Sequence, residues 1–238
     1  MNRPFAVFDI DGTLIRWQLY HALSDELVRM GVIDAQEFTV AKQARMTWKK
    51  RRSSSSFSDY EAALITIVDR AIIGMKVIDF DTAISKVISE YQDQVYTYTR
   101  DLINDLKTKN YLLFTISASP SPLVAMIANH YGFDDYRGSK YATNNGEFTG
   151  KKDVLLSQRK PEELKKMVTE HQASWDNSIA VGDSENDIPM LESVTTPIAF
   201  NPTKPLFDKA QSSGWKIVIE RKNMVYELEP RDGSFVLA

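Results

Sequence analysis

The chain has 238 residues, of which 43% are hydrophobic and 26% charged, and its net charge is −3. This composition predicts a globular protein, and a slightly acidic chain does not favour nucleic acid as a partner. Cysteine is absent, which excludes disulfides and thiolate metal sites. With no long apolar run and no room for a signal peptide before the first motif, we expect a cytoplasmic protein, monomeric or homodimeric, without membrane contacts.

The first predicted element is a short apolar strand over residues 4–8, which stops at a pair of carboxylates. Asp9 and Asp11 follow it at positions i and i+2, and Gly12 then permits a sharp turn. Ligands of open parallel sheets lie just beyond the carboxyl ends of the strands. Two carboxylates directed toward one spot repel each other unless a cation such as Mg²⁺ or a shared proton relieves them. An Asp-Gly turn without a chemical role is the alternative.

Residues 17–96 show helical patterns and no strand pattern. Apolar spacing, with breaks at glycine or serine, predicts four helices, over residues 19–30, 35–52, 58–73 and from about 79 to 94. These helices interrupt an α/β chain directly after its first strand. The sequence therefore predicts an inserted helical domain.

A second buried strand is predicted over residues 111–116, after a helix over 98–109. It leads into the sequence Ser-Ala-Ser-Pro at 117–120, and a new helix begins near Pro122. Hydroxyl groups and free backbone N–H groups ahead of a helix suit an anion. Serine-rich turns are also common, so this segment alone does not specify a function.

Strand-like pieces over 134–150 surround an Asn-Asn-Gly turn. A helix is then predicted over 160–170, with Lys160 at its N-terminus. A cation is electrostatically misplaced at this end of a helix, which indicates that Lys160 faces an anion. A lysine in contact only with solvent is the alternative.

A third buried strand is predicted over 178–182, and it too ends at carboxylates. Asp183 and Asp187 are four residues apart, so in a first helical turn they would share a face. The alternation of strands and helices continues over residues 198–200, 203–213, 216–219 and 225–228, the last as a possible edge strand. This alternation predicts a parallel, doubly wound sheet.

Four of these pieces together resemble the haloacid dehalogenase superfamily of phosphohydrolases. They are the D-I-D-G-T segment at 9–13, Ser117, Lys160 and the G-D-S-E-N-D segment at 182–187, in that order. The resemblance covers essentially the whole chain, and the helical insert looks like the small helical cap of that superfamily. Within the superfamily the chain looks most like the phosphoserine phosphatase branch, by the spacing from Lys160 to Asp183. The alternatives for this lysine are its neighbours Lys151, Lys152, Lys165 and Lys166.

The resemblance implies a division of the chain and an activity. Residues 1–16 and 97–238 would form a Rossmann-like α/β core, and residues 17–96 a helical cap domain. The implied activity is a Mg²⁺-dependent phosphatase, which hydrolyses a small phosphorylated metabolite through an aspartyl-phosphate. The cap would close over the site and select the leaving group.

The resemblance also implies a role for each motif residue. Asp9 would be the nucleophile, and Asp11 the general acid and then the base. Lys160 would stabilise the charges of Asp9 and of the phosphate. The phosphoryl oxygens would be bound by Gly12, Ser117, Ala118 and Lys160. The Mg²⁺ site would comprise Asp9, the backbone carbonyl of Asp11, Asp183 and, directly behind them or through water, Asp187.

One position departs from the phosphoserine phosphatase branch. Members of that branch carry a glutamate nine residues after the nucleophile, which meets the substrate ammonium, and here the position is Gln18. They also offer a cap arginine to the substrate carboxylate, for which Arg45, Arg51 and Arg52 are candidates. Trp17 beside the site favours a ring-bearing or apolar leaving group, or a neutral polyol. We therefore expect phosphoserine to be a poor or secondary substrate, with phosphoserine phosphatase as the alternative.

Four other classes of protein fit this pattern less well. A signalling receiver shares the phospho-accepting aspartate, but it is about half as long and lacks the helical insert. A phosphomutase usually belongs to a branch with another cap, a dehalogenase does without Asp11, and a non-catalytic relative would not fill every motif position. His21, His130 and His171 are expected to pack or to lie on the surface, and of these only His21 is near enough to the cap entrance to touch substrate.

Overall fold

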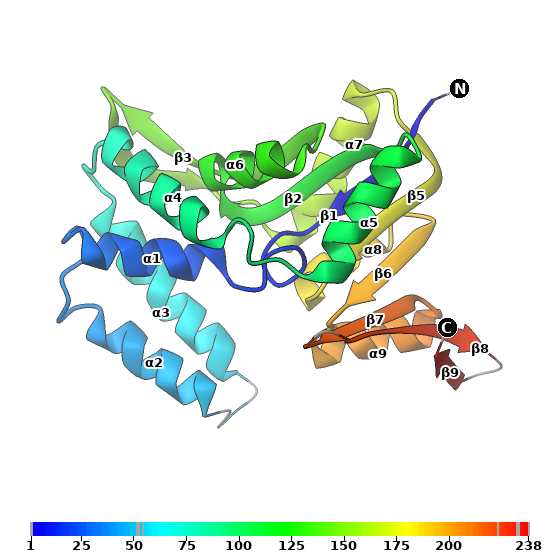
Figure 1. The fold of residues 1–238 in the computed structure, drawn as a ribbon. Coiled ribbons are helices and arrows are strands. Elements are labelled where there is room, and N and C mark those ends of the chain that lie inside the picture. Colours follow the sequence, from blue (N-terminus) through cyan, green and yellow to red (C-terminus); the bar gives the residue numbers. More distant parts are fainter. Residues whose placement is uncertain (1, 51–52, 54, 223, 232–233, 238) are drawn as a thin grey trace. The chain divides into compact units, whose positions relative to one another are not determined.

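The computed structural model describes residues 2–50, 53, 55–222, 224–231 and 234–237. The chain forms two compact units, which we call the core unit and the insert unit (Figure 1). The core unit comprises Met1–Gln18, Tyr91–Ser139 and Val154–Ala238. The insert unit comprises Leu19–Glu90 and Lys140–Asp153. The insert unit thus combines a segment close to the predicted helical insert with a hairpin that the prediction left in the core.

The core unit is built on one sheet with the strand order β3-β2-β1-β5-β6-β7-β8-β9. The pairs from β3 to β7 are parallel, and β8 and β9 add two antiparallel pairs at the edge. The strands are β1 (Pro4–Phe8), β2 (Leu112–Pro120), β3 (Asp135–Asn144), β5 (Ser174–Gly182), β6 (Thr196–Phe200), β7 (Lys216–Arg221), β8 (Met224–Arg231) and β9 (Ser234–Leu237). The predicted edge strand at 225–228 therefore lies within β8, which pairs with β7 on one side and with β9 on the other.

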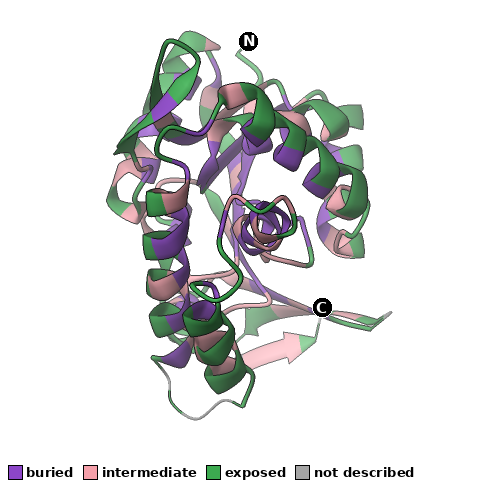
Figure 2. Ribbon diagram, turned by 90° about the vertical axis from the view of Figure 1, so that its left-hand side faces the viewer, coloured by how far each residue is buried: buried purple, intermediate pink, exposed green. Residues whose placement is uncertain are grey.

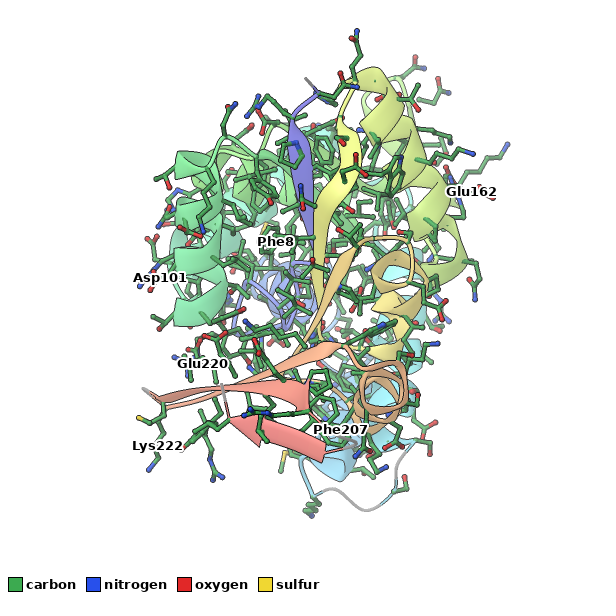
Figure 3. All side chains as sticks on the ribbon, turned by 90° about the vertical axis from the view of Figure 1, so that its right-hand side faces the viewer. Phe8, Asp101, Glu162, Phe207, Glu220 and Lys222 are labelled. Atoms are coloured by element: carbon green, nitrogen blue, oxygen red, sulfur yellow. The ribbon has the colours of Figure 1, made fainter. Side chains whose placement is uncertain are left out.

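Helices cover both faces of this sheet. They are α5 (Thr97–Thr108), α6 (Ser121–Tyr131), α7 (Lys160–Glu170), α8 (Ile188–Leu191) and α9 (Lys204–Ser213). In Figure 3, α5, with Asp101 labelled, lies on one side of β1 and β5, and α7, with Glu162 labelled, lies on the other. One core cluster packs Phe5 and Val7 of β1 against α7, α8 and α9. The doubly wound parallel fold predicted from the sequence is confirmed.

The chain reverses its direction across the sheet at β1. It proceeds from β1 to β2 and β3 on one side, and through β5, β6 and β7 on the other. Ligands of doubly wound sheets bind beyond the carboxyl ends of the strands at such a reversal. Asp9 follows β1, Ser117 lies near the end of β2 and Asp183 follows β5, so the fold brings three predicted site residues to this edge.

In its described residues, the insert unit consists of four helices and a hairpin. The helices are α1 (Leu19–Arg29), α2 (Thr39–Lys49), α3 (Ser56–Ala71) and α4 (Val77–Tyr91), and the hairpin joins the end of β3 to β4 (Glu147–Asp153). Each of these helices carries both buried and exposed residues, which Figure 2 shows by the colour of the ribbon. Every helix in the described part of the chain is too short or too polar to cross a membrane.

The hairpin is fastened to the insert unit by both its backbone and its side chains. Phe148 of β4 accepts a hydrogen bond from the Gly74 amide (2.8 Å) and donates one to the Met75 carbonyl (3.0 Å). Its ring packs edge to face on Phe80, with 4.9 Å between the ring centroids. The turn carries Gly146 at a φ of 81°, a conformation that glycine adopts without strain.

Candidate active site

The loop after β1 fits closely against the loop after β5. The Asp9 amide donates to the Val181 carbonyl (3.0 Å), which continues the pairing of β1 with β5. Gly12 has a φ of 85°, and a methyl group on it would lie 2.4 Å from Oδ2 of Asp183. Only glycine therefore allows the Asp183 carboxylate to approach the backbone of the first motif.

Lys160 lies at the centre of the acidic motifs. It is the first residue of α7 and only 3% exposed, and its Nζ donates to Oδ1 of Asp9 (2.9 Å) and to Oδ1 of Asp187 (2.6 Å). These two carboxylates offset the unfavourable position of an ammonium at a helix N-terminus. The four alternative lysines, Lys151, Lys152, Lys165 and Lys166, are exposed.

Asp187 closes the loop after β5. Its Oδ2 accepts hydrogen bonds from the amide of Asp183 (3.2 Å) and from the amide and hydroxyl of Ser184 (3.1 and 3.2 Å). The bond from the Ser184 amide belongs to a capping box, in which the Ser184 side chain also accepts a hydrogen bond from the Asp187 amide, at the start of a 3₁₀ turn over Glu185–Asp187. Asp183 and Asp187 therefore meet because a side chain folds back onto the loop, and not because they share a helical face as the spacing predicted.

Three carboxylates converge on one spot, and two of them, Asp9 and Asp187, contact the Lys160 ammonium. Asp9, Asp183 and Asp187 each place one oxygen within 4.8 Å of the others. Burial raises the pKa of Asp9 to about 8, although Lys160 opposes the shift. Burial, with Asp187 and Asp9, also raises the pKa of Asp183 well above its ordinary value. Burial alone would lower the pKa of Lys160, but Asp187 and Asp9 raise it instead.

This cluster fits a divalent cation. Three carboxylates face one ammonium, so the fully ionised site carries an excess of negative charge that a divalent cation would balance. The available ligand atoms are all carboxylate oxygens, which suit Mg²⁺ and Ca²⁺ rather than softer metals.

The Asp11 carboxylate is held away from this cluster. Its Oδ2 accepts hydrogen bonds from the hydroxyls of Ser117 (3.2 Å) and Ser119 (2.7 Å). The resemblance assigned Asp11 to the metal through its backbone carbonyl, and its side chain is not one of the three converging carboxylates. The two carboxylates of the first motif thus have different surroundings.

Backbone geometry fixes the loop that carries these hydroxyls. The Ala118 carbonyl accepts a hydrogen bond from the hydroxyl of Ser139 (2.6 Å), which in turn accepts one from the Leu155 amide (3.0 Å). Ala118 itself is exposed. The Ala118 peptide is therefore oriented by its hydrogen bond with Ser139.

Thr13 links the first motif to two other segments. Its hydroxyl donates to Oδ1 of Asp183 (3.3 Å), and its carbonyl accepts a hydrogen bond from the hydroxyl of Thr99 at the start of α5 (3.0 Å). Thr13 belongs to the first motif, but no role in the site was predicted for it. The contact with Asp183 depends on residues 170 positions apart, which the local pattern does not reveal.

Arg45 is already paired within the insert unit. Its guanidinium donates to Oδ2 of Asp25 and to the hydroxyl of Tyr60, both at 2.8 Å. These partners count against Arg45 as the arginine that meets a substrate carboxylate. The other two candidates, Arg51 and Arg52, lie outside the described residues.

His21 is packed inside the insert unit, which counts against the expectation that it touches substrate. Its side chain is 1% exposed, and its ring lies 4.7 Å from Tyr60 and 6.4 Å from Trp48, centroid to centroid. Burial lowers its pKa to about 3. Its surroundings are those of a neutral packing residue. His130 and His171 contact Asp93 and Asp135 in the core unit.

Comparison with known proteins defines the class to which this fold and site belong. The chain belongs to the haloacid dehalogenase-like hydrolases, whose family model matches residues 6–192. The chain is therefore an enzyme of a hydrolase family, and the resemblance predicted from the sequence is confirmed.

Its relatives include several phosphatases. Phosphoserine phosphatase SerB1 of Mycobacterium tuberculosis is 25% identical over 217 residues, which cover 89% of this chain and 69% of that protein. The histidinol-phosphatase of Neisseria meningitidis is 22% identical over 231 residues, which cover 91% and 98%. A solved phosphoserine phosphatase, a phospho-aspartyl intermediate analogue, shares the fold with a TM-score of 0.64 at 20% identity, covering 93% of this chain and 95% of that one. These relatives support a phosphatase of the phosphoserine phosphatase-like branch.

Proposed function

We propose that this enzyme hydrolyses a small phosphomonoester through an aspartyl-phosphate on Asp9. The observation that carries the proposal is the contrast between two neighbouring carboxylates. Asp9 is buried against the Lys160 ammonium, whereas Asp11 rests on two hydroxyls. One site thus supplies a nucleophile among charged groups and a separate acid–base group.

The proposed reaction has two steps. In the first, a carboxylate oxygen of Asp9 bonds to phosphorus while the ester O–P bond breaks, and Asp11 gives its proton to the leaving alkoxide. In the second, Asp11 takes a proton from water, the water oxygen attacks phosphorus and the bond to Asp9 breaks. Lys160 stays beside Asp9 and stabilises the negative charge that gathers on the phosphoryl oxygens. Ser117, Gly12 and Ala118 are proposed to bind those oxygens.

A divalent cation, Mg²⁺ by preference, is proposed as cofactor. Asp9, Asp183 and Asp187 would hold it, together with the Asp11 carbonyl. When bound, it would offset negative charge on the phosphoryl oxygens and on the carboxylates. Support comes from the raised pKa of Asp9, because a cation beside this buried carboxyl favours the ionised form that the attack requires.

The proposed substrate is a small metabolite whose phosphorylated alcohol lacks a carboxylate. Gln18 at the position of a glutamate, and the pairing of Arg45 with Asp25, support phosphoserine as a secondary substrate. A neutral amide cannot replace a carboxylate as the partner of an ammonium, and such sites discriminate strongly. Phosphoserine remains the second candidate substrate, since one relative is named a phosphoserine phosphatase. A ring-bearing amino alcohol phosphate is the third, since another relative is named a histidinol-phosphatase. A cytoplasmic location and a monomeric or homodimeric state remain predictions.

Phosphate release from a panel of phosphorylated metabolites, with Mg²⁺ and with a chelator, tests the proposal. Asp9→Asn should abolish turnover of every substrate and leave the circular dichroism spectrum unchanged. Asp176→Asn, on the exposed part of β5, is the matched control and should keep full activity. Residual activity of Asp9→Asn above about one per cent would refute the assignment of the nucleophile. A lead of tenfold or more for phosphoserine in kcat/KM would refute the interpretation of Gln18.

A further inference from the structure

The Asp11 carboxylate is held by a chain of two serine residues, and one of them has no assigned role. Ser119 Oγ donates to Oδ2 of Asp11 at 2.7 Å, a shorter contact than the 3.2 Å from Ser117. The Ser119 amide also donates to the hydroxyl oxygen of Ser117 (3.0 Å). Ser117 accepts this bond with an oxygen lone pair and donates its own hydroxyl hydrogen to Asp11. Ser119 therefore acts on the same carboxylate oxygen both directly and through Ser117.

The end of β2 explains why both hydroxyls face Asp11. Side chains at i and i+2 of an extended segment lie on the same side. Ser117 and Ser119 are 1% and 6% exposed, whereas Ala118 between them is exposed. The pairing of β2 with β3 shifts its register between Ile116 and Pro120, which marks an irregularity at this segment. Such irregularities commonly redirect side chains near functional sites.

We infer that Ser119 is a positioning residue for the proton transfer of Asp11. This inference rests on the proposed function. With Oδ2 held by the Ser119 hydroxyl, Oδ1 is the oxygen that carries the proton, and it gives that proton to the ester oxygen as the O–P bond breaks. In the second step Oδ1 takes the proton back from water. Ser119 itself neither gains nor loses a proton and does not touch the substrate.

The leaving group of the ester separates this role from a merely structural one. An alkyl alcohol leaves only with a proton, whereas 4-nitrophenol leaves readily as an anion. Loss of a hydrogen bond that orients Asp11 should therefore slow alkyl phosphates and spare 4-nitrophenyl phosphate. A packing defect in the loop, or the loss of a phosphate contact, should slow both esters alike.

The experiment measures kcat and KM of Ser119→Ala for a series of esters, from 4-nitrophenyl to alkyl phosphates, with saturating Mg²⁺. We expect kcat/KM for alkyl esters to fall about tenfold or more, and that for the nitrophenyl ester to stay within about twofold. Ser119→Thr, which keeps the hydroxyl, should recover most of the loss. Ser139→Ala is the matched control, because Ser139 bonds the same loop through Ala118 without touching Asp11. Any effect of Ser139→Ala should be equal across the series.

Two outcomes would overturn the inference. An equal loss for all esters, with weaker inhibition by inorganic phosphate, would make Ser119 a phosphate ligand. If Ser119→Ala were faster than the wild-type enzyme, the hydrogen bond from Ser119 would hinder Asp11 and not position it for proton transfer. Asp11→Asn keeps these outcomes distinct from failure of the proposed function: if it shows the wild-type dependence on leaving group, the role of Asp11 itself is wrong. If Ser119→Ala does not fold, Ser119→Cys, with a weaker donor, should show the same selective loss.

Discussion

Replacement of Lys160 by methionine is the most direct perturbation of the acidic cluster. The change removes an ammonium that lies 2.9 Å from Asp9 and 2.6 Å from Asp187, and it keeps a side chain of similar length. Both carboxylates are almost fully buried, so neither can turn to water for compensation. Asp9 and Asp187 would both lose the ammonium that contacts them.

We expect Lys160→Met to lower the free energy of unfolding by a large amount for a single substitution. Breaking a buried ion pair by removing one partner typically costs about 3–5 kcal/mol, because a charge is left buried without compensation. Loss of a group that stabilises the transition state should also lower kcat by about 10²–10³-fold. Since the ammonium of Lys160 no longer offsets the carboxylates, a divalent cation should stabilise the variant more than the wild-type protein.

Urea unfolding with a chelator, and then with millimolar Mg²⁺, measures both effects. Lys166→Met is the control, because Lys166 lies on the same helix, is 58% exposed and pairs with Glu163 at the surface; its replacement should change stability by less than about 0.5 kcal/mol. A loss below about 1 kcal/mol for Lys160→Met, together with retained turnover, would refute the placement of Lys160 in the site.

Three further perturbations test separate features. Gly12→Ala should weaken Mg²⁺ binding by calorimetry and lower stability by about 1–2 kcal/mol, because its φ of 85° is strained for alanine and the methyl group meets Asp183; unchanged affinity would contradict the close approach. Between pH 6.5 and about 3, His21 is protonated in the unfolded state and neutral in the folded state, so the free energy of unfolding should fall by up to about 1.4 kcal/mol per pH unit as the pH drops. The variant His21→Leu should show a shallower dependence of stability on pH, and an equal dependence would exclude His21 as the cause. Glu220, labelled near α5 in Figure 3, accepts hydrogen bonds from the amides of Thr97 and Tyr98 (3.1 and 2.9 Å) and so caps the N-terminus of α5. Glu220→Ala should lower the free energy of unfolding by about 1–2 kcal/mol, and an unchanged stability would mean that water replaces the carboxylate at these amides.

The strands of the core were predictable because buried parallel strands are nearly continuous apolar runs. The runs ending at Asp9 and Gly182 carry this signal in a few residues. The hairpin over 140–153 does not: its residues are mostly exposed and polar, and its membership of the insert unit depends on the contact of Phe148 with Phe80. That contact joins residues far apart in the chain, which local periodicity cannot encode.

Helix starts were misplaced for a related reason. The sequence around Ser58 and Asp79 resembles an N-cap, yet α3 begins at Ser56 and α4 at Val77. The polar residues lie inside the first turn, where an acidic side chain also favours the helix dipole. Capping residues and first-turn residues thus share a composition, and the pattern alone cannot separate them.

Several residues that the structure brings together were singled out in the sequence because each ends a strand or begins a helix. Asp9 and Lys160 were identified separately by that rule, and the structure brings them into contact across 151 positions. Ser119 was missed, although its i+2 spacing from Ser117 was a usable signal. The pairing of Arg45 with Asp25 depends on which helices pack together, so no sequence pattern could have excluded Arg45 beforehand.

The central place of β1 has a consequence for how the chain folds during synthesis. Phe5 pairs with Leu112, and Ala6 pairs with Ile179, so the first strand made is among the last to be completed. At a translation rate of about 5–20 residues per second, an apolar strand stays without its second partner for roughly ten to forty seconds. Contacts of such long sequence separation slow folding and leave strand edges exposed to aggregation. We expect refolding yield to fall steeply with protein concentration, and a chaperone that covers apolar segments to restore it.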